Sequence, residues 1–286
     1  MALYKTNTGK AKSIAFRNAS IMLILLVFAL ATIFPIYFMI ISSFGDPVEA
    51  GGMSYSLWPG KFSLDSYKFF FDYSKYSVRW LLNSLIVAVT VTISNVVFAS
   101  MAGYAFSKIQ FKGRNVLFAI LLVGMMIPYQ VTQVPLYILV VNIFEMENTY
   151  TALILPSIVT VYNIFLAKQF MSGIPKEIIE SAKVEGCSQW TIYTRIILPL
   201  SKTVLAVMAI LTFMDSWNTF FWPLLVTNSM EMQTIQVGLK NFRFANTTYF
   251  APMMAGATVA ALPMFILFFS LQRYFLEGVT VGAVKG

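Results

Sequence analysis

Histidine is absent from this chain, cysteine occurs once, at Cys187, and charged residues make up only 11% of its 286 residues. Without histidine or a second cysteine, the chain can form no intrachain disulfide and no zinc site of the usual Cys/His kinds. A soluble globular domain has about 25% charged residues, so the scarcity of charge indicates an integral membrane protein. The sequence also lacks an internal repeat, which disfavours a secondary transporter built from inverted repeats.

Hydrophobic residues make up 58% of the chain, and its mean hydropathy is +0.73. Six apolar runs reach the roughly 20 residues that are needed to cross a bilayer. These runs cover residues 21–44, 81–106, 115–141, 149–170, 203–227 and 250–271. The first run is longer than the apolar part of a signal peptide, which has about 7–15 residues. We therefore expect an all-α integral membrane protein with six transmembrane helices.

The lysines and arginines are distributed unevenly around these runs. If both termini are cytoplasmic, the inner segments hold fourteen of the twenty basic residues and the outer loops hold six. Cytoplasmic loops carry an excess of Lys and Arg, so this bias predicts that both termini lie inside. We expect a cytoplasmic amino-terminal segment at 1–20, a six-helix transmembrane domain at 21–273 and a cytoplasmic tail at 274–286. These topogenic residues account for the net charge of +8, so we expect no nucleic acid partner.

A polar loop at 172–202 separates the fourth and fifth runs. Its charges and glycine cannot lie in hydrocarbon, so we expect the loop in the cytoplasm. Pro175 suits the first turn of a short helix, and Gly186 can take the left-handed conformation that ends this helix. Ser188 can cap a second short helix, which Pro199 is expected to end.

The spacing in this loop resembles the EAA loop in the membrane subunits of binding-protein-dependent ABC importers. The family pattern is Glu-Ala-Ala, three residues, Gly, nine residues and Ile-x-Leu-Pro, and here a serine replaces the first alanine. The corresponding positions in this chain are Glu180, Ser181, Ala182, Gly186, Ile196, Leu198 and Pro199. The resemblance implies the six-helix fold of the type I ABC importers, with a cytoplasmic coupling-helix loop. In that family, the glutamate of the loop pairs with an arginine of the ATP-binding subunit.

Two further stretches resemble the carbohydrate-importer permeases of the maltose-transporter MalG type. One reads Asp-Ser-Trp-Asn-Thr-Phe-Phe-Trp-Pro-Leu-Leu at 215–225, and the other reads Gly-Val-Thr-Val-Gly-Ala-Val-Lys-Gly at 278–286. Such permeases translocate a carbohydrate by alternating access, surrounded by lipid in the bacterial or archaeal inner or plasma membrane. The implied partners are a second homologous permease subunit, two ATP-binding subunits, and an extracellular or periplasmic solute-binding protein.

A phosphate-binding loop is missing from the sequence. Neither Gly9-Lys10 nor Gly60-Lys61 is followed by Ser or Thr, or preceded by a glycine at the spacing of such a loop. We therefore expect that the chain is no enzyme by itself and holds no cofactor or metal. ATP and Mg are then bound by the partner ATPase subunits.

Asp215 is the only acid within the six apolar runs. An intramembrane carboxylate usually faces the bundle interior or a water-filled cavity. With Trp217 and Asn218, it is a candidate for the lining of a sugar path, because aromatic faces stack on sugar rings while amides and carboxylates bind hydroxyl groups. The alternative is that Asp215 bonds to a neighbouring helix and Trp217 is plain packing.

The outer loop at 228–249 is the candidate contact with the binding protein, because in the resembled permeases this loop reaches into that protein. Its candidate residues are Asn241, Phe242, Arg243, Asn246 and Tyr249, although a solvated polar loop would look the same. Two other functions stay open. An ABC importer of a non-sugar solute is the nearer one, whereas an ion-coupled secondary transporter would need several embedded acids or histidines.

Overall fold

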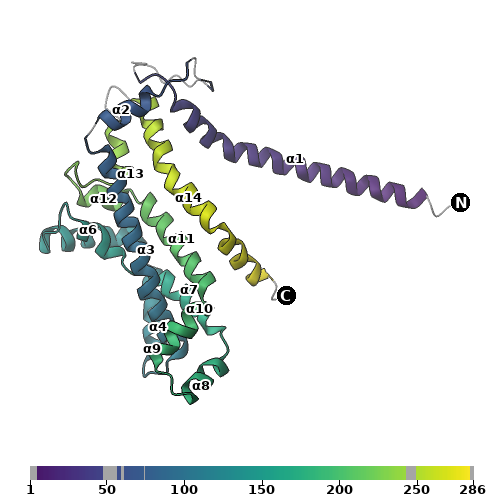
Figure 1. Cartoon of the computed structure of the whole chain (residues 1–286), viewed down its shortest axis with the longest axis vertical. Helices are drawn as coiled ribbons and strands as arrows, with labels where there is room; N and C mark the ends of the chain where they lie inside the picture. The colour runs from purple at the N-terminus through teal and green to yellow at the C-terminus, as the bar shows by residue number, and fades with distance from the viewer. Residues whose placement is uncertain (1–4, 48–56, 59–60, 74, 243–248, 284–286) are drawn as a thin grey trace. The chain divides into compact units, whose positions relative to one another are not determined.

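The computed structural model describes residues 5–47, 57–58, 61–73, 75–242 and 249–283, and these residues form helices and loops without a strand. The chain divides into two compact units. The first unit comprises Met1–Phe70 and Phe242–Val259, and the second comprises Phe71–Asn241 and Ala260–Gly286. Figure 1 shows the helices in chain order, from purple at the amino terminus to yellow at the carboxyl terminus.

The first unit contains α1 (Lys5–Ser42) and the first turns of α2 (Asp65–Tyr73) and α14 (Phe250–Ala283). Aromatic rings make much of its packing: the centroids of Phe38 and Phe250 are 6.2 Å apart, and those of Phe70 and Phe242 are 5.5 Å apart. Such ring pairs add stability beyond the area that they bury.

The second unit is organised around α3 (Ser77–Lys108), which packs along α7 (Val161–Ser172) and α11 (Lys202–Asn218). The two helices approach closely at Gly103, where a side chain would place its Cβ only 2.5 Å from the Cβ of Ala167. Small residues at such crossings let the backbones of membrane helices come close enough for tight packing. The sequence thus fixes this crossing with one glycine and one alanine.

Three helices are long and apolar enough to cross a membrane, namely Phe16–Ser42, Ser77–Lys108 and Phe250–Ser270. Three bent pairs of helices each give one more candidate span, so the described residues hold up to six by length and composition. The pairs are Arg114–Met125 with Tyr129–Ile143, Tyr150–Ser157 with Val161–Ser172, and Gln189–Leu200 with Lys202–Asn218, bent by 93°, 40° and 78°. Five of the predicted runs fall on these segments, and the fifth run, 203–227, shares only residues 203–218 with the last bent pair.

Prolines accompany two of the bends. The 93° bend separates α4 (Arg114–Met125) from α5 (Tyr129–Tyr137) and lies at Pro128. The 40° bend follows Pro156, which lies in the short helix η2 (Leu155–Ser157) before α7. A proline lacks the N–H that would continue the helical bonding, so the axis changes direction there.

The fifth run was expected as one helix over 203–227, and this is wrong in detail. Helix α11 ends at Asn218, and a separate helix, α12 (Phe221–Val226), follows an extended residue, Thr219. Pro223 has no N–H to bond to the carbonyl of Thr219, so the helix restarts with this proline in its first turn.

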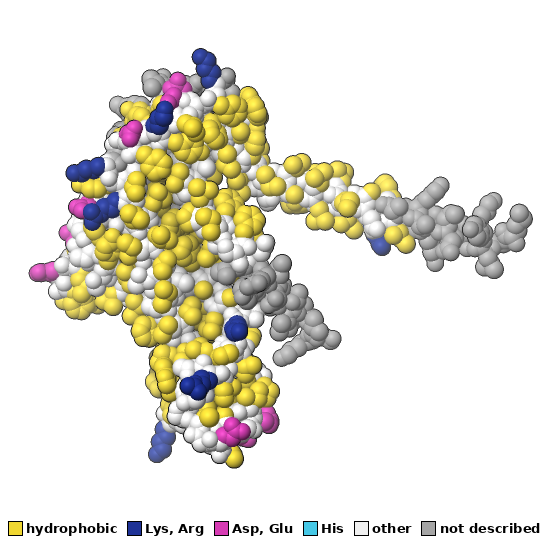
Figure 2. All heavy atoms as spheres, in the orientation of Figure 1, with side chains coloured by type: hydrophobic (Ala, Val, Ile, Leu, Met, Phe, Trp, Pro, Cys, Tyr) yellow, Lys and Arg dark blue, Asp and Glu magenta, His cyan; other side chains and the backbone are white. Residues whose placement is uncertain are grey.

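The remaining helices of the chain are short. They are η1 (Ile138–Ile143), α6 (Tyr150–Ile154), α8 (Lys176–Val184), α9 (Gln189–Ile192), η3 (Tyr193–Ile197), α10 (Leu198–Leu200), α13 (Ile235–Leu239) and η4 (Lys240–Phe242). Figure 2 shows hydrophobic side chains over the long helices of the second unit, and basic and acidic side chains both at the end that holds α8 and at the opposite end. This is the distribution of a membrane protein with two polar ends.

Candidate functional site

The polar loop folds into two short helical segments that are joined at Gly186. At this residue φ is +81°. The N–H of Gly186 donates to the carbonyl of Lys183 at 3.0 Å, and the N–H of Cys187 donates to the carbonyl of Ala182 at 3.0 Å. These two bonds form the Schellman end of a helix, where glycine takes the left-handed conformation without side-chain strain. The predicted conformation of Gly186 is therefore confirmed.

The second segment begins at a side-chain cap and ends at a bend. The hydroxyl of Ser188 accepts the N–H of Thr191 at 3.1 Å, which confirms the predicted cap. The predicted end at Pro199 is wrong, because the helix continues through α10 and bends only at Ser201. Just before the proline, η3 widens to the π-helical pattern, and a wide turn there relieves the clash between a proline ring and the preceding turn.

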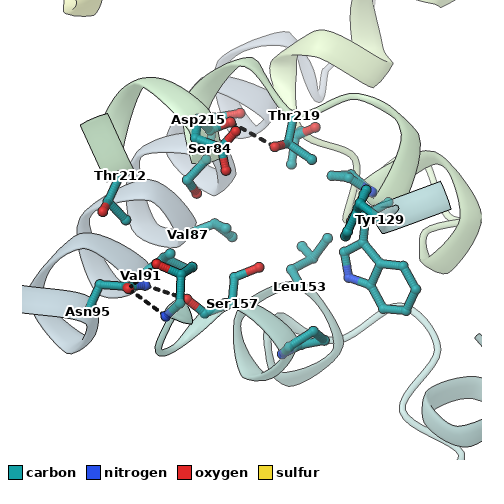
Figure 3. A pocket seen from close by; sticks show the side chains of 16 residues that line it. Ser84, Val87, Val91, Asn95, Tyr129, Leu153, Ser157, Thr212, Asp215 and Thr219 are labelled. Atoms are coloured by element: carbon teal, nitrogen blue, oxygen red, sulfur yellow. Dashed lines mark hydrogen bonds between the residues drawn. The ribbon is translucent and has the colours of Figure 1, made fainter. Parts of the chain in front are cut away.

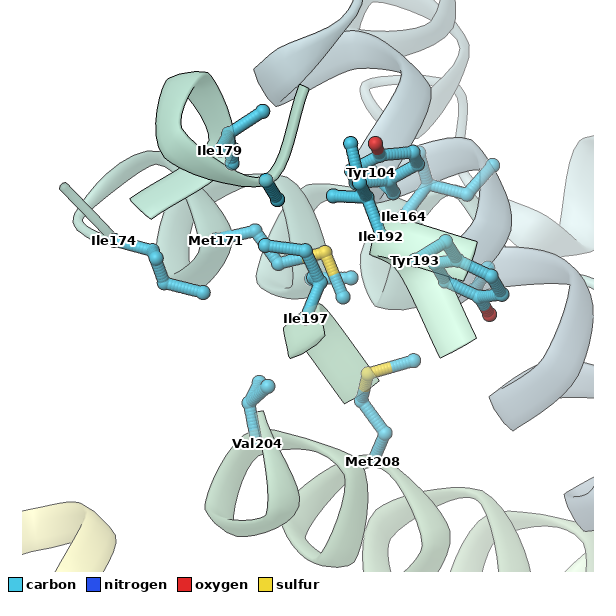
Figure 4. Packing of buried hydrophobic residues seen from close by; sticks show 13 residues of the cluster. Tyr104, Ile164, Met171, Ile174, Ile179, Ile192, Tyr193, Ile197, Val204 and Met208 are labelled. Atoms are coloured by element: carbon cyan, nitrogen blue, oxygen red, sulfur yellow. The ribbon is translucent and has the colours of Figure 1, made fainter. Parts of the chain in front are cut away.

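The seven residues of the Glu180–Pro199 pattern divide between the core and the surface. Ala182 is only 6% exposed and packs with Ile179 into a buried cluster that Figure 4 shows. Ile196 and Leu198 pack against the same cluster. The exposed members are Glu180, Ser181, Gly186 and Pro199. Ala182 is therefore a pattern position that the core of the chain itself covers.

The buried cluster connects α8 to the long helices. Ile179 and Ala182 of α8 belong to it together with Met171 of α7, Met208 of α11 and Ile197 of η3. Close-packed interiors have few voids, so a displacement of one member is passed to its neighbours. Through this cluster, helix α8 is therefore linked mechanically to α7 and α11, which both pack on α3.

The outer face of the loop combines exposed carboxylates with exposed apolar side chains. Val184 is 89% exposed and Trp190 is 61% exposed. Glu180 is exposed, and neither ion pair in the described part of the chain, Lys68–Asp65 or Arg79–Glu231, uses it. Exposed apolar side chains and a carboxylate outside both ion pairs give the loop the chemistry of a protein contact with a basic partner.

A cavity of about 450 Å³ opens within the second unit, among α3, α5, η2, α11 and α12 (Figure 3). Pockets that bind small molecules usually have about 300–1,000 Å³. Its lining consists of Ser84, Val87, Val91, Asn95, Tyr129, Leu153, Pro156, Ser157, Thr160, Thr212, Asp215, Ser216, Thr219, Trp222, Pro223 and Thr234. The cavity is therefore the candidate site for a small ligand.

Of the three residues proposed for a sugar path, Asp215 alone lines this cavity. Trp217 is 2% exposed, and its indole N–H donates to the carbonyl of Ala260 at 3.0 Å, so it serves as packing. The amide of Asn218 donates to the carbonyl of Met214 in its own helix at 2.8 Å. The described residues give the Asp215 carboxylate no ion pair, and they bring no cluster of acids or cysteines together that could hold a metal.

A buried polar network borders the cavity, and sequence reasoning missed it. The side-chain oxygen of Asn95 accepts the N–H and the hydroxyl of Thr160 at 2.9 and 3.1 Å, and the amide of Asn163 at 3.0 Å. The amide of Asn95 donates to the carbonyl of Ser157 at 2.6 Å, and that of Asn163 donates to Thr212 at 2.7 Å. The signal was an asparagine inside an apolar run, which needs partners from other helices.

The outer loop is anchored on α3. The indole N–H of Trp80 donates to the carbonyl of Met230 at 2.6 Å, and the amide of Asn83 donates to the carbonyls of Glu231 and Gln233, both at 2.9 Å. Gly238 lies so close to Trp80 that a Cβ there would be 2.3 Å from the ring. The start of the loop is therefore tied to the helix rather than free.

The candidate residues for the binding-protein contact differ in their surroundings. The amide of Asn241 donates to Gln233 at 2.8 Å, and Phe242 is fully buried. The ring of Tyr249 lies 4.8 Å from that of Phe69, and Arg243 and Asn246 lie outside the described residues. In this structure the ring of Phe242 is packed inside the chain.

Comparison with known proteins gives similarities to a family, to individual permeases and to a solved structure. Residues 95–281 match the model of a family described as binding-protein-dependent transport system inner membrane component. The chain is 36% identical over 260 residues to the arabinooligosaccharides transport system permease protein AraQ of Halalkalibacterium halodurans, covering 90% of this chain and 93% of that protein. It is 30% identical over 265 residues to the sn-glycerol-3-phosphate transport system permease protein UgpE of Brucella abortus, covering 90% and 93%.

Among solved structures, the chain is similar to a chain from a bacterial ABC transporter involved in the import of the acidic polysaccharide alginate. The TM-score is 0.80 with 20% identity, and the match covers 92% of this chain and 98% of that one. At this identity, the likeness shows a common fold.

Proposed function

This chain belongs to the family of binding-protein-dependent transport system inner membrane components, and we propose that it is the permease subunit of an ATP-driven carbohydrate importer. Its apolar helices and its family make it a multi-pass protein of the inner membrane. The similarity to AraQ and the stretches of MalG type support a carbohydrate as the substrate. An importer of a non-sugar solute is the nearest alternative, and the similarity to UgpE favours it.

We infer that both termini and the α8–α9 loop lie in the cytoplasm, since this orientation places most of the basic residues inside. The chain works beside a second homologous permease, two ATP-binding subunits and a solute-binding protein on the outer side. ATP and Mg bind to the ATP-binding subunits. The loop at 228–249 is the proposed contact with the binding protein, with Asn241, Arg243, Asn246 and Tyr249 as candidates.

The observation that carries the coupling role is the two-sided packing of α8. Its outer side offers Glu180 and the apolar Val184 to an ATP-binding subunit, and its inner side packs Ile179 and Ala182 into the cluster with α7 and α11. Closure of the ATP-binding subunits thus moves α8, and the close-packed cluster transmits the motion to the long helices. ATP shifts the access equilibrium only through its different affinities for the two states, and a full switch needs about 5.5 kcal/mol.

The test replaces the proposed contact residue and a matched acid nearby. Glu180→Ala should abolish uptake by the complete transporter in proteoliposomes, because the loss of one partner in a partly desolvated charge pair costs about 2–5 kcal/mol. Glu185→Ala removes an equally exposed acid just beyond α8 and should leave most of the uptake. Uptake of radiolabelled sugar and ATP hydrolysis are measured together with the amount of ATP-binding subunit that copurifies.

Equal uptake by the two variants and the wild type would refute α8 as the coupling element. Loss of uptake in both variants, with normal copurification, would show that Glu180 has no special role. Sugar binding by the separate solute-binding protein serves as the control, since neither variant touches it.

A further inference from the structure

The cavity of the second unit has a lining rich in hydroxyl groups and poor in charge. Seven of its lining residues carry a hydroxyl on a serine or threonine, namely Ser84, Ser157, Thr160, Thr212, Ser216, Thr219 and Thr234. Asp215 is the only charged residue of the lining, and no lysine or arginine occurs among the lining residues that the structure describes. A site that binds a phosphate or a carboxylate normally supplies a basic side chain or a cluster of backbone N–H groups.

One hydroxyl of the lining is left without a partner. Thr234 is 5% exposed, and its hydroxyl finds no hydrogen bond among the described residues. A buried polar group without a partner is costly, so such groups usually bind a ligand or an ordered water. The hydroxyl of Thr234 is buried in the wall, so the hydroxyls that a ligand can reach are those of half-buried lining residues such as Ser157 and Ser216.

The polar groups lie on more than one side of the cavity. Figure 3 shows Asp215 and Thr219 on one rim and Asn95 with Ser157 across the opening. Tyr129 and Trp222 add aromatic surface, and the indole N–H of Trp222 is already donated to the carbonyl of Ala152 at 2.9 Å. Aromatic rings bind the apolar faces of sugar rings, and hydroxyls and carboxylates bind the sugar hydroxyls. A polyhydroxylated ring fits this lining.

The Asp215 carboxylate decides which charge the ligand can carry. It accepts hydrogen bonds and donates none, so it pairs with the hydroxyls of a neutral sugar. An anionic group at about 6 Å from it is disfavoured about threefold even at the dielectric constant of water, and by more in a less polar cavity. The described residues of the lining include no cation that could compensate this repulsion.

From these observations we propose that the cavity is a subsite of the translocation path that accepts uncharged saccharides and rejects anionic ones, such as uronates and phosphorylated sugars. The proposal rests on the proposed carbohydrate transport and adds a charge rule, namely that the saccharide in the cavity carries no negative charge. The selecting group is Asp215, and the half-buried Ser157 and Ser216 are the hydroxyl partners of the sugar, while Asn95 holds the wall behind them.

The first test measures the electrostatic potential in the cavity. Thr219→Cys is placed in the complete transporter, in which Cys187 and the cysteines of the partners are replaced by serine. A cationic and an anionic methanethiosulfonate reagent are applied, and each rate is divided by the rate of that reagent with a free thiol. With Asp215 present, the cationic reagent should react at least about tenfold faster than the anionic one, because the two opposite charges shift in opposite directions. Asp215→Asn should bring the two rates within about twofold.

The second test uses sugars as protecting ligands in the same labelling reaction. Arabinotriose, which is neutral, should slow labelling at Thr219→Cys at least threefold, whereas the trimer of galacturonic acid should not. In the Asp215→Asn background, both trisaccharides should protect. Lys112→Cys, which lies outside the cavity, is the matched control and should be protected by neither.

The outcomes separate the two proposals. If the galacturonate trimer protects equally with Asp215 present, or if the two reagents react equally, the charge rule is overturned while carbohydrate transport stands. If arabinotriose fails to protect while the transporter still takes up neutral oligosaccharides, the cavity is not the subsite. Uptake of a non-sugar solute with no uptake of any oligosaccharide would overturn the proposed function itself.

Discussion

Replacing Asn95 with alanine should weaken the second unit by about 2–3 kcal/mol, because this side chain ties α3 to the bend before α7. It takes part in four hydrogen bonds with Ser157, Thr160 and Asn163, and it is fully buried. Polar contacts between membrane helices contribute about 0.6 kcal/mol each on average and up to about 1.7. Four such contacts amount to about 2 kcal/mol, and the lost side-chain volume adds to this figure.

The cavity beside Asn95 limits the loss, since water can reach some of the freed groups. Without rehydration, each unsatisfied buried group would cost about 1–3 kcal/mol. The assay is the thermal midpoint of the permease in detergent, read as the fraction that stays monodisperse after heating. The midpoint should fall on the order of 5 °C.

Asn218→Ala is the matched control for this experiment. It removes the same amide group, but Asn218 is exposed and bonds only to the carbonyl of Met214 in its own helix. Its effect should stay within about 0.5 kcal/mol, as for most surface substitutions. Equal midpoints for Asn95→Ala and Asn218→Ala would refute the idea that the network holds the bend.

Three further predictions concern the loop, the orientation and the nucleotide chemistry. Gly186→Leu should abolish uptake, since a left-handed turn costs a residue with a side chain roughly 1–2 kcal/mol. Gly124→Leu is the control and should be tolerated, because there is open space around Gly124. Equal uptake by the two variants would contradict the role of the helix end at Gly186. In a chain without Cys187, a cysteine at Lys112 should be labelled only from the cytoplasm and one at Lys240 only from outside, and the reverse pattern would invert the proposed topology. The purified chain alone should hydrolyse no ATP, as measured by phosphate release, and steady hydrolysis by it would contradict the assignment to partner subunits.

Local rules predicted the ends of the short helices well. Gly186 and Ser188 act through bonds to residues within five positions, so their conformations follow from the neighbouring sequence. Pro199 failed as a helix end because η3 widens before it, and this adjustment depends on how Ile197 packs in the cluster with α8. Propensity is a weak prior wherever tertiary contacts can outweigh it.

The candidate ligand residues show a second limit of sequence reasoning. Asp215 and Trp217 are two positions apart on one helix, which puts them on nearly opposite sides, so they could not line one cavity together. The sequence was sufficient to see this. By contrast, the network of Asn95 joins three segments far apart in the chain, and only the fold brings Thr160 and Thr212 to it.

The bend at Pro128 has a consequence for how the chain enters the membrane during synthesis. Helix α4 has 12 residues, so it rises only about 18 Å, well short of the roughly 30 Å of a hydrocarbon core. Neither half of this pair can therefore be inserted as a stable spanning helix by itself. The backbone groups freed at the bend need partners in neighbouring helices, so the third segment should leave the translocon for the lipid only together with helices that it packs on, among them α3 and α7.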